Sequence, residues 1–145
     1  MRRIAYWFCA LAIVTAWPLG AETRPNFTGV WKLSEAAASA ADGPRQIVFR
    51  IEHKEPVFRY EASGQTGYQP FREAFEFTTD GKAPADASKL AVTAAWEGQS
   101  LATRYVKGGK ELAKFVLRLS AGGRQLTRDG QMPDGRKIHQ TYDRQ

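Results

Sequence analysis

The sequence contains almost no cysteine: Cys9 is the only one among 145 residues. It lies in an apolar segment near the amino terminus that we expect to be removed. The remaining chain therefore has no disulfide to stabilise it, even in a compartment that permits disulfides. It must be held together by packing, and a hydrophobic content of 43% is sufficient for one packed core.

A hydrophobic run long enough to cross a membrane is also missing. Arg2 and Arg3 precede an apolar stretch, residues 4–17, which is shorter than the roughly 20 residues that a spanning helix needs. Pro18 and small residues follow, which is typical of a secretory signal peptide. We predict a signal peptide over residues 1–21, a secreted or periplasmic location, and no stable membrane insertion after cleavage. The alternative is an uncleaved anchor.

A strong charge of one sign is absent as well. The net charge of +6 falls to +4 when Arg2 and Arg3 leave with the signal peptide. This excess is mild, and the basic residues do not gather in a stripe. A nucleic-acid partner is therefore not expected.

Motifs for metal binding and catalysis are missing too. His53 and His139 are isolated in sequence, with no acidic partner at ligand spacing, so no metal site and no cofactor are expected. There is no G-x-S-x-G nucleophile elbow, although one sequence leaves a Ser-His-Asp assembly open. Glu73 and Glu76 fall on opposite faces of their predicted strand, which does not favour a catalytic carboxylate pair.

Alternation of apolar and polar residues is what the sequence has in abundance. In the segment 26–33, one face carries Phe27, Gly29, Trp31 and Leu33. A period of two predicts a strand with one buried face. A large indole beside a glycine indicates that another stretch of backbone approaches closely there.

The same alternation recurs along the rest of the chain. It predicts strands over residues 46–54, 57–62, 71–79, 89–97, 100–107, 111–120, 125–130 and 136–144. Residues 63–70 and 80–88 are predicted as longer loops at a barrel mouth. The Ala-rich residues 34–44 favour a short helix and a plain loop equally.

Strands that each bury one face must stack against a second sheet or close on themselves. A consecutive meander closes most simply as an up-and-down barrel. The predicted fold is therefore all-β: an antiparallel up-and-down β-barrel of about 8–10 strands, with one short helix or loop after the first strand. It forms a single domain over residues 22–145.

The opening segment Phe27-Thr28-Gly29-Val30-Trp31-Lys32-Leu33 resembles the F-x-G-x-W-K-L start of the fatty-acid-binding protein and lipocalin families, the calycins. The chain is also similar to small secreted bacterial proteins with lipocalin-like barrels. The residues that carry this second resemblance are Gly29 to Leu33, Trp96-Glu97-Gly98 and Tyr142-Asp143-Arg144. Both resemblances imply an internal cavity for a small hydrophobic or amphipathic molecule.

The resemblance also implies where a ligand would be held. In the fatty-acid-binding family, an Arg-x-Tyr pair on the last strand and an arginine on an earlier strand hold the ligand carboxylate. Here Tyr142 matches the tyrosine, but Gln140 stands at the arginine position. Arg128 could replace one of the arginines.

The inferred inward faces define a set of candidate ligand-binding residues: Arg128, Tyr142, Gln140, Tyr105, Phe75, Phe77 and Tyr60. A buried charge is costly unless it is paired. An inward Arg128 therefore needs a carboxylate such as Glu73 or an anionic ligand. A one-residue slip in strand register would instead turn Arg128 towards solvent. Trp31 and Trp96 are assigned to the core.

Three functions remain open from the sequence. The first is a monomeric binding protein for a small hydrophobic or amphipathic molecule. The second is an interaction module whose barrel is filled by its own side chains. The third is an enzyme on the same scaffold. The volume of the interior, and whether Arg128 lines it, separate the first two.

Overall fold

The structure is a computed structural model that describes residues 23–34, 44–82, 85–86 and 88–145. The predicted signal peptide and most of the Ala-rich segment lie outside these residues. The described part is all-β, and none of it forms a helix long and apolar enough to span a bilayer. Its strands are β1 (Gly29–Leu33), β2 (Pro44–Lys54), β3 (Val57–Thr66), β4 (Gln69–Thr78), β5 (Ala91–Glu97), β6 (Ser100–Lys107), β7 (Lys110–Leu119), β8 (Gln125–Gln131) and β9 (Lys137–Arg144).

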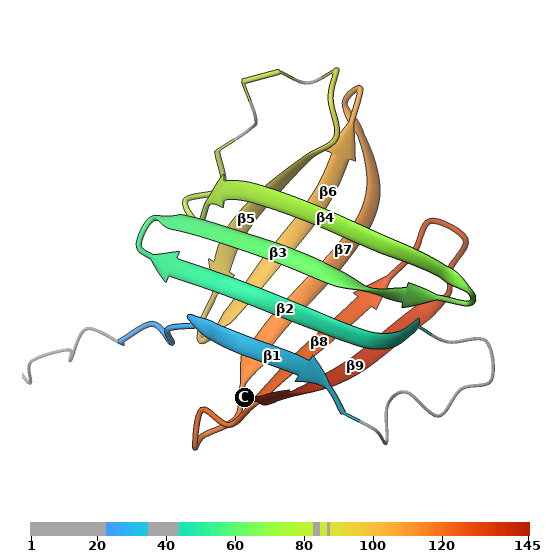
Figure 1. The fold of residues 1–145 in the computed structure, drawn as a ribbon. Helices are drawn as coiled ribbons and strands as arrows, with labels where there is room; N and C mark the ends of the chain where they lie inside the picture. Colours follow the sequence, from blue (N-terminus) through green and yellow to red (C-terminus); the bar gives the residue numbers. More distant parts are fainter. Residues whose placement is uncertain (1–22, 35–43, 83–84, 87) are drawn as a thin grey trace, which may run out of the picture.

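The nine strands form one antiparallel sheet in the order β4-β3-β2-β1-β9-β8-β7-β6-β5. Strands β1 to β4 cross the strands behind them at a steep angle, so the sheet curls back on itself (Figure 1). The predicted all-β barrel is confirmed, and its strand number lies within the predicted range.

The barrel is nearly closed, and the seam lies between the two edge strands, β4 and β5. Since each of the nine strands is antiparallel to its neighbour, the first and last strands of the sheet run in the same direction. An antiparallel ladder between β4 and β5 is therefore excluded. Among the described residues, the seam is bridged by the pair Asp80 and Ala95 and by a hydrogen bond from Gly81 N to Ala94 O of 2.7 Å.

Two local predictions were wrong. Residues 63–70 are not a loop, because β3 and β4 continue as a long hairpin to a tight turn at Gly67 and Tyr68. Gly67 has a φ of 60°, which lets two residues reverse the chain, and Ser63 and Gly64 had weakened the strand signal. Leu90 was expected inside a strand, but it lies before β5 and is 45% exposed.

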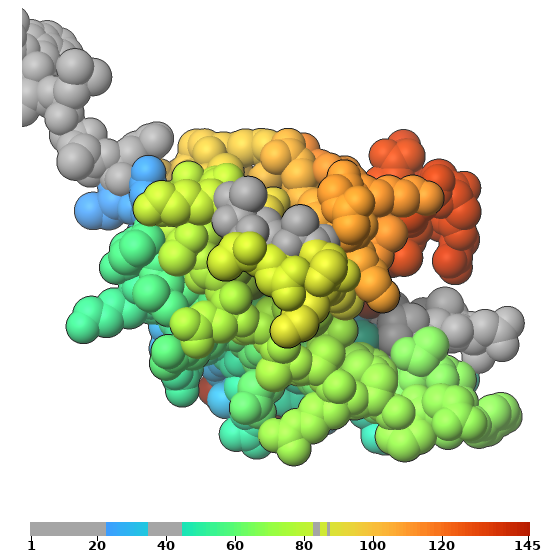
Figure 2. All heavy atoms as spheres, turned by 90° about the horizontal axis from the view of Figure 1, so that it is seen from above, coloured from blue at the N-terminus to red at the C-terminus, as the bar shows by residue number. Residues whose placement is uncertain are grey.

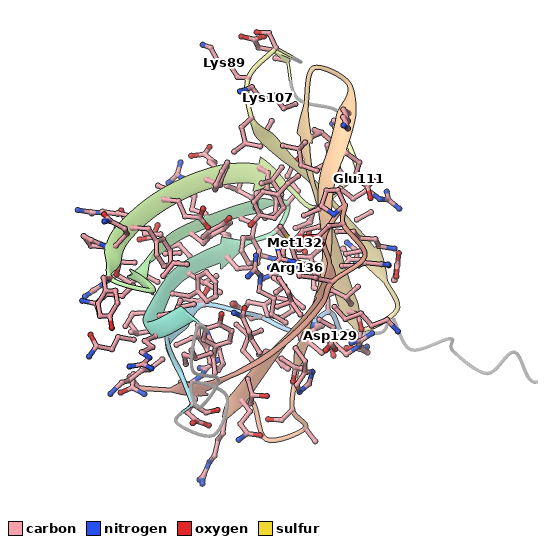
Figure 3. The ribbon with its side chains drawn as sticks, turned by 90° about the vertical axis from the view of Figure 1, so that its right-hand side faces the viewer. Lys89, Lys107, Glu111, Asp129, Met132 and Arg136 are labelled. Atoms are coloured by element: carbon pink, nitrogen blue, oxygen red, sulfur yellow. The ribbon has the colours of Figure 1, made fainter. Side chains whose placement is uncertain are left out.

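Trp31 belongs to the core, as the sequence predicted. This side chain is fully buried, and its Nε1 donates a hydrogen bond to Phe27 O at 2.9 Å. Phe27 is also fully buried and stacks on Trp96, with ring centroids 5.9 Å apart. Side chains fill the space that the strands enclose (Figure 3).

The close approach at Gly29 is made by side chains and not by the backbone that the sequence suggested. The position of a Cβ at Gly29 lies 3.5 Å from Nε1 of Trp31 and 3.7 Å from the guanidinium carbon of Arg144. Arg144 in turn lies over the Trp31 ring at 4.5 Å. These distances are ordinary van der Waals contacts, so Gly29 borders the stack of indole and guanidinium at this end of the barrel.

Candidate functional site: polar residues inside the barrel

Arg128 lies inside the barrel, in the middle of β8. It pairs with Gln140 of β9, and its Nη1 donates a hydrogen bond to Gln140 Oε1 at 3.1 Å. The hydroxyl of Tyr142 donates to the same oxygen at 2.8 Å. The register is set by Leu126, which is fully buried on the same face of β8, because a one-residue slip would expose it.

The Arg128 guanidinium rests on aromatic rings. Its central carbon lies 3.5 Å from the ring centroid of Phe115 and 5.7 Å from that of Phe49. The Phe115 ring itself lies over Gly130, where an added Cβ would overlap the ring. The stacked arrangement holds the plane of the guanidinium, and the N–H groups of a guanidinium point outwards in that plane as hydrogen-bond donors.

Arg128 has no carboxylate partner in the part of the chain that the structure describes. Glu73, the partner that the sequence suggested, instead accepts a hydrogen bond of 3.5 Å from the Tyr60 hydroxyl. The Glu73 carboxylate acts on the same three phenols as Arg128, so it lies in this region without forming a direct ion pair with the guanidinium. A half-buried cation without a direct ion pair favours the binding of an added anion.

Three phenols surround this charge. Tyr60 and Tyr142 are buried and Tyr105 is half-buried, and the hydroxyls of Tyr60 and Tyr105 hydrogen-bond each other. Burial raises the pKa of all three phenols, and the charge of Arg128 opposes this rise at each of them. The phenols are therefore protonated at neutral pH and can donate hydrogen bonds to an anion.

The interior next to Arg128 is almost filled. A cavity of about 20 Å³ is lined by Phe49, Ile51, Phe58, Tyr60, Phe77, Thr103, Tyr105, Leu117, Leu126 and Arg128. This volume holds about one water molecule. A larger hollow of about 450 Å³ lies on the outer faces of β7 and β8, away from the Arg128 site. Any ligand larger than water requires side chains of the interior to move.

The inward side chains of β4, at its seam with β5, become more exposed towards the start of the strand. Along the inward face of β4, Phe77 is buried, whereas Phe75, Glu73 and Phe71 are half-exposed. The seam therefore widens towards the start of β4. Seen from above, the yellow residues of the β4–β5 connection lie between the green and the orange strands (Figure 2).

Glu55 closes the other end of the seam. Its Oε1 accepts a hydrogen bond of 2.7 Å from Trp96 Nε1 on β5, and its Oε2 accepts one of 2.6 Å from Thr79 Oγ1 after β4. One carboxylate thus connects the turn between β2 and β3 with both edges of the sheet. This contact joins the edges without backbone pairing.

Both histidines have acidic partners in the structure, although the sequence places no acidic residue at metal-ligand spacing from either. His53 is buried, its Nε2 lies 3.1 Å from Glu55 Oε1, and its Nδ1 accepts the Phe27 N–H at 3.3 Å. On the outer face, His139 Nδ1 lies 2.5 Å from Asp129 Oδ1. Asp129 is labelled in Figure 3. His53 and Glu55 are two residues apart at a turn, and Asp129 and His139 are cross-strand partners. Neither spacing is typical of metal ligands. The described residues contain no group of three or more potential metal ligands.

The contacts of Glu55 predict an acid-sensitive stability. Desolvation raises the pKa of this carboxyl, but the hydrogen bonds from Thr79, His53 and Trp96 together lower it below its usual 4.5. A carboxyl whose pKa is lowered by folding adds stability above its unfolded pKa and loses it as pH falls through the folded pKa. We expect the urea midpoint to decrease below about pH 4.5, and to decrease less steeply in Glu55→Gln. Equal pH slopes for the two proteins would contradict this prediction.

The structure brings the predicted site residues together to different degrees. Arg128, Gln140 and Tyr142 form one hydrogen-bonded group, and Tyr60 and Tyr105 form a second group across the cavity. Sequence reasoning missed that the Phe115 ring packs directly on Gly130 and leaves no space for a Cβ there. An isolated glycine within a strand pattern is a signal of such a close approach.

Comparison with known proteins supports the fold. No protein-family model matches the chain, and a search of curated proteins finds no match. A mutant of the fluorescent protein UnaG is similar in structure, with a TM-score of 0.52, 17% identity, and coverage of 81% of this chain and 95% of that chain. The REP1-NXSQ fatty acid transporter is similar with a TM-score of 0.55, 12% identity, and coverage of 82% and 96%.

The chain therefore has the calycin fold, the fatty-acid-binding-protein-like and lipocalin-like β-barrel. The resemblance read from the opening strand is confirmed at the level of the fold. At these identities the likeness concerns the fold alone, and function must be argued from the residues of the interior.

Proposed function

We propose that this protein binds a small amphipathic anion inside its barrel, with Arg128 as the charged anchor. The observation that carries the proposal is a guanidinium in the barrel interior with no carboxylate partner among the described residues. Tyr142 and Gln140 lie beside it as neutral hydrogen-bonding groups. An anionic head group would balance the charge and accept hydrogen bonds from two or more donors.

The apolar part of the ligand would be desolvated among the aromatic and aliphatic side chains beneath Arg128. Such burial contributes about 25 cal/mol per Å² of apolar surface removed from water. Because the cavity of about 20 Å³ is too small for the ligand, binding includes a displacement of side chains at the β4–β5 seam. The occurrence of the same fold in a fatty acid transporter supports a ligand-binding role.

We further propose that the mature chain is exported and acts as a monomer. The proposal is based on the signal-peptide pattern of residues 1–21. Amino-terminal sequencing of protein recovered from the periplasm or medium of a bacterial host tests it. A cytoplasmic chain that retains Met1 would contradict export.

Replacing Arg128 by glutamine is expected to weaken anion binding by about tenfold to a hundredfold, because a charge-assisted hydrogen bond contributes about 1.5–3 kcal/mol. The measurement uses anilinonaphthalene sulfonate, an amphipathic anion whose fluorescence increases in apolar surroundings. Displacement of the dye by carboxylates, and by uncharged alcohols with the same carbon skeleton, then measures how much the charge of the head group contributes to affinity.

The matched control is Arg118→Gln on the outer face of β7, where Arg118 pairs with Asp129 at 2.7 Å. This variant removes the same charge from the protein but not from the interior, so dye affinity should be unchanged. Equal affinities for the wild type and Arg128→Gln, or equal losses in both variants, would overturn the proposal.

A second function has one observation in its favour. The small cavity also fits an interaction module whose barrel is filled by its own side chains. This alternative predicts that neither the dye nor any carboxylate binds at the interior. It also predicts that Arg128→Gln changes stability alone.

A further inference from the structure

We infer that the preferred ligand is a small aromatic carboxylate with a single ring, which binds in the place of the Phe75 ring. This inference rests on the proposed function, since it requires that Arg128 hold an anionic head group. The inference adds the chemical class of the apolar part of the ligand. Three features of the interior support an aromatic ring: the shallow space beneath Arg128, the exposed position of Phe75, and the tyrosine side chains that Phe75 contacts.

The space beneath Arg128 is shallow. The next inward residue of β8 is Leu126, two positions away, which corresponds to about 7 Å along a strand. Leu126 and its cross-strand partner Tyr142 are both fully buried. They belong to the same packed cluster as Trp31. Between Arg128 and the packed core there is therefore space for a group about as large as one ring. An extended long chain held at Arg128 would meet the packed core.

Phe75 is the aromatic side chain of this region best placed to leave. It is half-exposed at the seam, whereas Phe49, Phe58 and Phe77 are buried. Its ring centroid lies 5.5 Å from that of Tyr60 and 5.6 Å from that of Tyr105. Rotation of Phe75 outwards through the seam would vacate a slot the size of one ring, without disturbing the packed core.

The walls of this slot favour a ring. Tyr60 and Tyr105 form its two sides, and Phe75 now makes a tilted contact with the first and an edge contact with the second. A ligand ring would restore both contacts, whereas an alkyl chain would restore neither and would lose more rotational freedom on binding. Two such ring contacts correspond to about a tenfold preference for a ring over a chain of equal size.

The polar groups at the slot fit the same class of ligand. Arg128 lines the same small cavity as Tyr60 and Tyr105, so the cation borders the slot. A carboxylate attached to a planar ring can therefore reach the guanidinium while the ring lies between the tyrosines. The hydroxyl pair of Tyr60 and Tyr105 can hydrogen-bond a hydroxyl substituent on that ring.

The first experiment compares cinnamate with nonanoate, a straight-chain carboxylate with the same number of carbons, by isothermal titration calorimetry of the folded protein. Cinnamate is expected to bind about tenfold more tightly. Equal or tighter binding of nonanoate would overturn the aromatic preference while leaving the proposed anion site intact. Failure of both to bind, or binding unaffected by Arg128→Gln, would overturn the proposed function itself.

The second experiment tests the place of the ring. Removing the resident ring in Phe75→Ala is expected to increase cinnamate affinity by about tenfold, because the ligand no longer displaces it. Phe71→Ala is the matched control, since Phe71 lies on the same half-exposed face of β4, whereas the ring contacts with Tyr60 and Tyr105 are made by Phe75. Cinnamate affinity that falls in Phe75→Ala would place the ligand elsewhere. An equal rise in affinity in both variants would also contradict binding in the place of the Phe75 ring.

Circular dichroism of each variant shows whether it is folded. If Phe75→Ala does not fold, Phe75→Leu provides the same test, because leucine keeps the side chain apolar but removes the resident ring. A gain in cinnamate affinity in this variant supports the inference, and an unchanged or lower affinity overturns it.

Discussion

Trp31→Ala is expected to lower the free energy of unfolding by about 3–5 kcal/mol, a range typical of deleting a fully buried aromatic side chain. The indole is completely inaccessible, and its Nε1–H bonds to Phe27 O at 2.9 Å. Alanine removes this packing, leaves the Phe27 carbonyl without that donor, and removes the ring on which Arg144 lies. Small domains are stable by about 5–15 kcal/mol, so the loss is a large fraction of the total.

The measurement is urea unfolding followed by far-ultraviolet circular dichroism, because the substitution also removes a fluorophore. Val30→Ala is the control from the same strand, with a half-buried side chain on the opposite face. It should cost much less, within about 1 kcal/mol. If Trp31→Ala unfolds at the same urea concentration as Val30→Ala, the indole is not the centre of the core.

Gly130→Ala is the second substitution with a large expected effect, a destabilisation of about 1–3 kcal/mol from overpacking. The new Cβ would overlap the Phe115 ring and would lie 3.0 Å from the carbonyl oxygen of Lys114. The φ of Gly130 is not in the left-handed region, so the cost comes from the lack of space and not from backbone strain. Displacement of Phe115 would also remove the ring that carries the Arg128 guanidinium.

A double-mutant cycle isolates this clash. In a Phe115→Leu background the ring is gone, so the added methyl group of Gly130→Ala should cost less than in the wild type. Gly122→Ala is the control for glycine replacement in general, because nothing lies within 4 Å of its added Cβ. An equal cost of Gly130→Ala in both backgrounds would show that Phe115 does not occupy the space above the glycine.

These substitutions concern residues whose surroundings were predictable to different degrees. The burial of Trp31 follows from alternation within one short segment, because side chains of a strand point to opposite faces in turn. The need for a glycine at position 130 does not follow from alternation. It depends on which ring the neighbouring strand places opposite, and β7 places Phe115 there.

The candidate site shows the same division. The inward direction of Arg128 depended on strand register, which the buried Leu126 sets within β8 itself. Of the two counter-charges that the sequence left open for Arg128, Glu73 forms no direct ion pair with it and lies on β4 beside Tyr60. The sequence does not specify how strands so far apart align across the interior. The acidic partners of both histidines were missed for a related reason, since a turn and a strand pairing bring them together.

By itself, the sequence determined the presence of the strands, their inward faces and the absence of disulfides, because these properties depend on local alternation and composition. The extent of the β3–β4 hairpin and the start of β5 did not follow from it. Only the tertiary structure decided that nine antiparallel strands leave β4 and β5 running in the same direction, with a seam between them. It also decided that the interior is almost filled, with about 20 Å³ beside Arg128. Both properties depend on strand number and on contacts between side chains distant in sequence, which alternation within a strand does not encode.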